Sequence, residues 1–127
     1  MSEGGGMGPG AGPERTDFTQ ADWMFERIIR SLKAFEESLG PNEDVGIRLV
    51  ALPGDVLRIE NVGYWNPDLI KFFGSTAEGH RYELIQHVSQ VNLMLVALAK
   101  AQEEPRRIGF NLVEQFETRR AARNAAA

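Results

Sequence analysis

The sequence predicts an α+β domain in which one amphipathic N-terminal helix packs on a five- or six-stranded antiparallel, strongly bent sheet or small barrel. Apolar residues recur every three or four positions in 19–39, which is the period of a helix. From residue 45 onward they recur at every second position, which is the period of a strand, and Gly- and Pro-containing turns divide the segments. With 127 residues, of which 43% are hydrophobic, the chain fits one globular domain.

Three regions of the chain differ in composition. Residues 1–15 are rich in Gly and Pro, so we expect a disordered tail. Residues 16–113 carry the periodic patterns and form the single predicted globular domain. Residues 114–127 are basic and rich in Ala, and we expect a C-terminal tail or a frayed helix there.

The predicted N-terminal helix, 19–39, has start, stop and burial signals. Thr19 and Asp22 are spaced like a capping box, and Phe18 and Trp23 stand at the positions of a hydrophobic staple. Gly40, which precedes a proline, predicts a left-handed cap at the end of the helix. The residues expected on the buried face are Phe25, Ile28, Leu32, Phe35 and Leu39.

The first two strands are predicted to form a hairpin. Residues 45–50 and 56–62 each alternate apolar with other residues, as a strand with one buried face does. Pro53 and Gly54 between them form a strong tight-turn dipeptide. The two strands are therefore expected to pair side by side.

The later segments predict a second hairpin and further strands. Residues 69–73 and 81–88 flank the turn-rich segment 74–79. Residues 91–99 are apolar on both faces, which fits a buried strand or a short helix, and we favour a strand. Residues 106–113 alternate again and form the sixth expected strand.

Composition narrows the class of protein. There is no cysteine, so disulfides and cysteine metal sites are excluded, and no apolar run approaches the roughly 20 residues that span a bilayer. No signal-peptide pattern is found, so we expect a cytoplasmic protein without membrane contact.

The charge of the chain is unevenly distributed. The net charge is −4, and residues 105–127 contribute +3 from five arginines and two glutamates, so the rest of the chain carries −7. This excess of acid disfavours RNA as the partner.

Three stretches resemble a family of small bacterial proteins that is catalogued as a domain of unknown function. They are GYWNPDLI at 63–70, LIQHVSQ at 84–90 and RRIGF at 106–110. The resemblance covers about 23–112, the whole expected domain. It implies no activity, substrate or cofactor.

One helix followed by five closely spaced strands is also similar to the Sm-like fold, which includes the bacterial RNA chaperone Hfq and commonly forms rings. In that family a Lys-His pair at the end of strand four contacts RNA, and Gln86 and His87 occupy the similar place here. Asp68 stands near the position where that family has a base-stacking aromatic. The resemblance thus implies an Sm-like or SH3-like barrel, while His87 alone matches the RNA-binding pattern.

Tyr64, Trp65 and Asp68 form a candidate binding loop. Two large aromatics beside turn-forming residues are a usual way to build a contact surface. Aromatic residues also serve as lids over a core, each with one polar contact. Both interpretations stay open at the level of sequence.

Gln86 and His87 end a predicted strand, where the imidazole suits a base contact, a proton carrier or a structural hydrogen bond. Ser89 lies two residues on, but neither an oxyanion site nor an orienting acid can be assigned to it. His80 and Glu83 fall on opposite faces of a strand, so we expect no metal site, and no cofactor is implied.

Arg106 and Arg107 are candidate contacts to phosphate or to an acidic partner, as are Arg119, Arg120 and Arg123. A solvated helix end also accounts for these arginines, because cations near a helix C-terminus complement its dipole.

Together these patterns predict a non-catalytic binding or assembly module, acting as a homo-oligomer that holds a protein or RNA partner. Residues 91–99 are more apolar than one sheet face would bury, so we expect strand-edge pairing with another copy. The alternative is a small enzyme or ligand-sensing domain with a pocket around His87.

Overall fold

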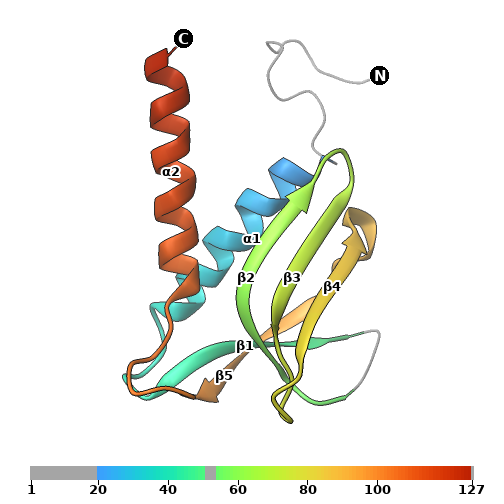
Figure 1. Cartoon of the computed structure of the whole chain (residues 1–127), viewed down its shortest axis with the longest axis vertical. Coiled ribbons are helices and arrows are strands. Elements are labelled where there is room, and N and C mark those ends of the chain that lie inside the picture. The colour runs from blue at the N-terminus through green and yellow to red at the C-terminus, as the bar shows by residue number, and fades with distance from the viewer. Residues whose placement is uncertain (1–19, 51–53, 127) are drawn as a thin grey trace.

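The computed structural model describes residues 20–50 and 54–126, which form two α-helices and one five-stranded antiparallel sheet curled into a half-barrel (Figure 1). This confirms the predicted α+β class. The elements are α1 (Ala21–Glu36), β1 (Glu43–Leu49), β2 (Leu57–Trp65), β3 (Leu69–Ser75), β4 (Arg81–His87), the 3₁₀-helix η1 (Val88–Gln90), β5 (Leu93–Ala99) and α2 (Ile108–Ala126).

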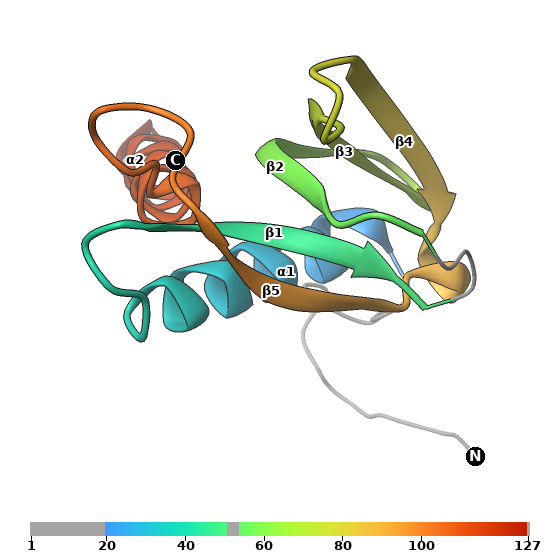
Figure 2. The same cartoon turned by 90° about the horizontal axis from the view of Figure 1, so that it is seen from below.

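The strands lie in the order β4-β3-β2-β1-β5, so β4 and β5 are the two edges of the sheet. β1 pairs with β5 along its whole length but with β2 only where Gly46 and Ile47 face Arg58 and Leu57. Figure 2 shows β1 and β5 running across α1 while β2, β3 and β4 turn away from them. The short β1–β2 contact is therefore the corner at which the sheet bends.

Both predicted hairpins and the predicted strand in 91–99 are confirmed. β1 pairs antiparallel with β2, β3 with β4, and β5 with β1. Gly79 has a φ of 89° in the turn between β3 and β4, a conformation in which glycine carries no side-chain penalty. The turn expected at Pro53, the helix start at Phe18 and Thr19, and the tail at 1–15 lie outside the described residues.

The core forms where α1 packs on the alternating face of the sheet. On β3 every second residue is buried, as the period of two predicted, whereas on β1 the four consecutive residues 44–47 are buried. Phe72 and Ile70 of β3 and Ile47 of β1 are fully enclosed. The buried set comprises Ala21, Phe25, Ile29, Leu32, Val45, Ile47, Ile59, Val62, Ile70, Phe72, Val88, Ile108, Leu112 and Val113.

The predicted end of the first helix was wrong by one turn. α1 ends at Glu36, and the amides of Ser38 and Leu39 bond to the carbonyls of Phe35 and Glu36 in tight turns. Because these turns satisfy the last carbonyls, no left-handed cap is needed, and Gly40 does not adopt a positive φ. The buried face is also rotated: Ile29 is enclosed, whereas Ile28, Phe35 and Leu39 are only partly buried.

The strand predicted for 106–113 was wrong, because this segment begins α2. Ile108, Leu112 and Val113 are buried against α1, while Phe110 is 37% exposed. The buried residues are four and five positions apart, which places them on one side of a helix. The alternation that predicted a strand depended on Phe110, which is not part of this buried side. α2 then stands beside β2 with its C-terminal end beyond the sheet (Figure 1).

Candidate functional site

The two aromatics of the predicted binding loop point to opposite faces of β2, as neighbours on a strand must. The Tyr64 ring packs against Phe25 of α1 at 4.9 Å between centroids, although 44% of Tyr64 stays exposed. Trp65 is 64% exposed, and its ring lies 5.2 Å from the Lys71 ammonium. Tyr64 is thus partly a lid over the core, whereas Trp65 lies on the surface.

The turn that follows these aromatics holds the start of α1. The Ala21 amide donates to the Pro67 carbonyl at 2.8 Å, and the Asp22 amide donates to the Asn66 side-chain oxygen at 3.1 Å. Gln20 provides no side-chain cap, so this turn satisfies amides that α1 cannot satisfy itself. Asn66 and Pro67 therefore have a structural role.

Asp68, His87 and Ser89 form a chain of polar contacts at the ends of β3 and β4. His87 Nε2 lies 3.3 Å from the Asp68 carboxylate, and His87 Nδ1 lies 2.8 Å from Ser89 Oγ. The Ser89 amide also donates to Nδ1 at 3.1 Å, which makes His87 the cap of η1. Asp68 is therefore an acid in contact with His87, which the sequence alone could not assign, and the side chains of both residues are about half exposed to solvent.

Gln86 lies next to His87 but points to the other face of β4. It pairs with Ile70, which is fully buried, and its side-chain oxygen is buried with no hydrogen-bond partner among the described residues. Gln86 and His87 therefore do not form one binding site.

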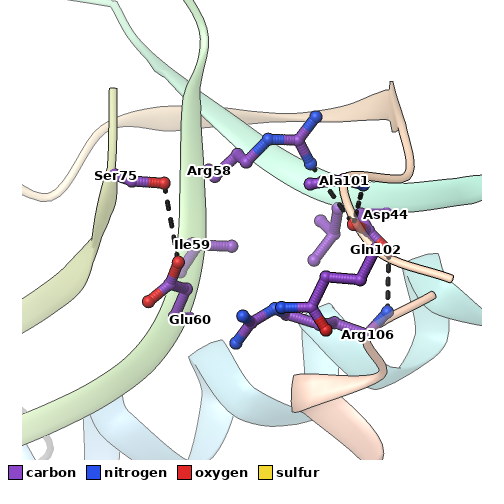
Figure 3. A pocket seen from close by; sticks show the side chains of 9 residues that line it. Asp44, Arg58, Ile59, Glu60, Ser75, Ala101, Gln102 and Arg106 are labelled. Carbon is purple, nitrogen blue, oxygen red and sulfur yellow. Dashed lines mark hydrogen bonds and ion pairs between the residues drawn. The ribbon is translucent and has the colours of Figure 1, made fainter. Parts of the chain in front are cut away.

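A polar cavity of about 230 Å³ lies where β1, β2, β3 and the loop before α2 meet (Figure 3). Asp44, a residue that is 4% exposed, organises one wall with its carboxylate. It accepts hydrogen bonds from the Arg106 amide at 2.7 Å, the Ala101 amide at 3.4 Å and the Arg58 guanidinium at 3.2 Å. A buried charge needs such partners, because an unpaired carboxylate would be costly to desolvate.

The side chains of Arg106 and Glu60 supply the free charges of this cavity. In Figure 3 the Arg106 guanidinium and the Gln102 amide extend from the loop toward the β2 side, where Glu60 lies beside Ser75. Ser75 Oγ is 3.5 Å from the Glu60 carboxylate. Within 20–50 and 54–126, the Arg106 guanidinium has no hydrogen bond or ion pair.

Glu60 reaches this position through a β-bulge. Ile59 faces Gly74 and Asn61 faces Phe73, so Glu60 is the extra residue of β2 between them. Such bulges redirect side chains and occur often beside functional sites. A side chain on Gly74 would overlap the Arg58 carbonyl, which explains glycine at this close approach.

Arg107, the second arginine of the predicted pair, is structural. Its guanidinium donates to the carbonyls of Glu43 at 2.7 Å, Gly40 at 3.1 Å and Arg106 at 2.9 Å. These bonds fix the loop that precedes α2. Of the two adjacent arginines, Arg106 therefore faces the cavity, whereas Arg107 binds backbone carbonyls.

Glu36 is the other buried carboxylate, at 2% exposure. It accepts the amides of Gly109 at 3.0 Å and Phe110 at 3.1 Å, so a side chain of α1 caps the start of α2. Burial raises the pKa of Glu36, and the hydrogen bonds from these two amides and the nearby Arg107 charge oppose that rise.

The remaining predicted residues give no further site. Arg120 pairs with Glu26 at 3.4 Å and covers the Phe116 ring, while Arg119 and Arg123 are exposed on α2. No group of three or more metal-capable side chains occurs in the described part of the chain, and none of its helices is long and apolar enough to cross a membrane.

The sequence analysis missed Asp44, Arg58 and Glu60 as cavity residues. Asp44 was a detectable signal, since it is a charged residue at the start of an apolar strand. Glu60 was not detectable, because the bulge that redirects it depends on the pairing of β2 with β3.

The fold and the cavity define a small α+β domain with a curled half-barrel sheet and a charged pocket at one corner. A family model described as "Family of unknown function (DUF6173)" matches residues 20–111, and the chain belongs to this family. Comparison with curated proteins and with solved structures gives no match.

Proposed function

We propose that this domain is a non-catalytic assembly module that joins two copies through the edge strand β5 and presents the surface around Trp65 to a protein partner. The observation that carries the proposal is the composition of β5, Leu93–Ala99, which contains no polar side chain and lies at an edge of the sheet. An exposed apolar strand edge is a template for pairing with another chain.

The two edges of the sheet differ in a way that favours pairing of β5 with itself. Of the four exposed positions of β4, one is Ile85 and the others are Arg81, Glu83 and His87, and polar side chains of this kind normally protect a free edge. On β5 the exposed positions include Met94, which is 55% exposed. A two-fold axis would place this apolar edge against its own copy.

An apolar groove continues the edge of β5 toward α1. It has a volume of about 400 Å³ and is lined by Met24 and Ile28 of α1 and by Leu93 and Leu95 of β5, among others. A second β5 pairing at the edge would also cover part of this groove. Burial of apolar surface beside the new backbone hydrogen bonds would stabilise the dimer.

Light scattering at tens of micromolar tests the proposal. We expect the wild type to show twice the chain mass of 14.1 kDa and Met94→Lys to show the monomer mass, because a charge at this exposed position opposes edge pairing. Ile85→Lys is the matched control, since Ile85 is 52% exposed on the other edge strand, β4. This control is expected to remain a dimer.

A wild type that is only monomeric at this concentration would contradict the proposal. Dissociation by Ile85→Lys as well as by Met94→Lys would indicate pairing of β4 with β5 of the next copy. That head-to-tail contact would build a ring, as the Sm-like resemblance implies, and would replace the two-fold dimer.

A protein partner is favoured over RNA by charge. Outside 105–127 the chain carries a net charge of −7, and Arg120 is already paired with Glu26. We expect no change in fluorescence anisotropy of a labelled single-stranded RNA at low salt. Binding that weakens steeply with added salt would make RNA the partner instead.

A second candidate function, a small enzyme or ligand-sensing domain around His87, is favoured by the Asp68–His87–Ser89 contacts. The capping of η1 explains the same geometry without catalysis. An esterase assay separates the two: hydrolysis of an activated ester that is lost in Ser89→Ala would support the enzyme, and no hydrolysis by the wild type would support the cap.

A further inference from the structure

We propose that the polar cavity beside Asp44 binds a small zwitterion of the α-amino-acid class, with the carboxylate on Arg106 and the ammonium on Glu60. This site is independent of the assembly edge proposed above. The carrying observation is the placement of two charges of opposite sign on facing walls of one cavity, one on the loop before α2 and one on β2 (Figure 3).

The cationic wall is held in place without using the Arg106 guanidinium. The Arg106 amide is fixed by Asp44 at 2.7 Å, and the Arg107 guanidinium binds the Arg106 carbonyl at 2.9 Å. Both bonds involve the backbone, so the side chain of Arg106 is free to meet a ligand. A guanidinium offers paired donors that suit a carboxylate.

The anionic wall is Glu60, an exposed residue at the bulge of β2 that lines the cavity. Ser75 is its neighbour at 3.5 Å, a long contact that leaves the carboxylate able to accept further donors. A carboxylate in this state accepts charge-assisted hydrogen bonds from an ammonium.

Arg58 and Asp44 do not change the charge balance of the cavity. They pair with each other at 3.2 Å, and a second nitrogen of Arg58 donates to the Ala99 carbonyl at 2.6 Å. What remains free is one cation and one anion, which complement a neutral zwitterion better than a simple anion. The cavity volume of about 230 Å³ lies below the roughly 300–1,000 Å³ of pockets for drug-sized ligands, which suits a small amino acid.

Isothermal titration of the full chain with serine, glycine and glutamate tests the proposal. Two analogues report on each charge separately: serine methyl ester lacks the carboxylate, and N-acetylserine lacks the ammonium. We expect at least one free amino acid to bind with a millimolar or lower Kd. Loss of either charge is expected to weaken that binding at least about tenfold.

Arg106→Gln and Glu60→Gln are expected to weaken binding by a similar factor while the protein stays folded, because the Arg106 backbone contacts remain. Arg119→Gln, an exposed arginine on α2, is the matched control and is expected to bind as the wild type does. Circular dichroism of each variant separates loss of binding from loss of folding.

Three results would overturn the proposal. They are no binding of any probe at millimolar concentration, equal binding of the two analogues and the free amino acid, and unchanged binding by Arg106→Gln. Melting temperatures of Arg106→Gln, Glu60→Gln and the double variant test whether the two side chains pair directly with each other. If no probe binds and the decrease in Tm of the double variant differs from the sum of the two single decreases, Arg106 and Glu60 form an ion pair and not a ligand site.

Discussion

Glu36 is a buried carboxylate whose role depends on a distant part of the chain. It lies in the last turn of α1 and accepts two amides at the start of α2. Without it these amides would have no acceptor in a buried place, which costs about 1–3 kcal/mol. We therefore expect Glu36→Ala to lower the free energy of unfolding by about that amount in urea titrations, whereas Glu37→Ala, an exposed neighbour, stays near zero.

The raised pKa of Glu36 predicts a dependence of stability on pH. The folded protein holds this proton more tightly than the unfolded chain, whose carboxyl titrates near 4.5. The stabilisation is complete below that pH and is lost as the pH rises through the higher pKa of the folded state. We expect the free energy of unfolding of the wild type, measured relative to that of Glu36→Gln, to fall as the pH rises from 4.5 through the pKa of Glu36 in the folded state. A difference between the two proteins that does not change with pH would contradict the raised pKa.

Trp65 tests whether the aromatic loop is a surface or a lid. Since Trp65 is 64% exposed, we expect Trp65→Ala to change the free energy of unfolding by no more than about 0.5 kcal/mol. Ile70→Ala, at a fully buried position on the neighbouring strand, is expected to cost about 2–5 kcal/mol. A Trp65→Ala cost near that of Ile70→Ala would show that Trp65 covers the core.

At the scale of elements, the contact between α1 and α2 depends on Gly109. A methyl group there would lie 2.5 Å from the Lys33 amide nitrogen and 2.7 Å from the Leu32 carbonyl carbon, both of which are backbone atoms that cannot move independently. We expect Gly109→Ala to separate the helices and to cost about 1–3 kcal/mol in thermal unfolding, despite the higher helix propensity of alanine.

Gly63→Ala is the control for this substitution. Its methyl group would meet Phe73 at 3.6 Å, an ordinary contact distance. A cost of Gly109→Ala no larger than that of Gly63→Ala would mean that the two helices can adjust their spacing without loss of packing.

At the scale of the whole molecule, the proposed dimer couples stability to concentration. Two-state unfolding of a dimer raises Tm as the protein concentration rises, because association favours the folded state. We expect the wild-type Tm to rise by roughly 2–5 °C for each tenfold increase in concentration. The Tm of Met94→Lys is expected to be independent of concentration, and a concentration-independent wild type would oppose the dimer.

The sequence by itself determined that a helix precedes the strands, where β1 to β4 lie, and that they form two hairpins, while for β5 it favoured a strand without excluding a helix. These features follow from periods of apolar residues and from turns, which are local properties that no distant contact overrode. It also indicated Tyr64, Trp65 and His87 as candidate site residues without deciding between a surface and a structural role; Trp65 is 64% exposed, Tyr64 is 44% exposed and the His87 side chain is 48% exposed.

Only the tertiary structure decided that 108–113 is helical and that Asp44, Arg106 and Glu60 share a cavity. The alternation of Ile108, Phe110 and Leu112 fits a strand, but packing against α1 and the cap from Glu36 select the helix. The cavity joins residues 44, 60 and 106, and one of them reaches it through a bulge. Contacts between such distant positions leave no period in the chain, so they arise from the packing of the folded domain alone.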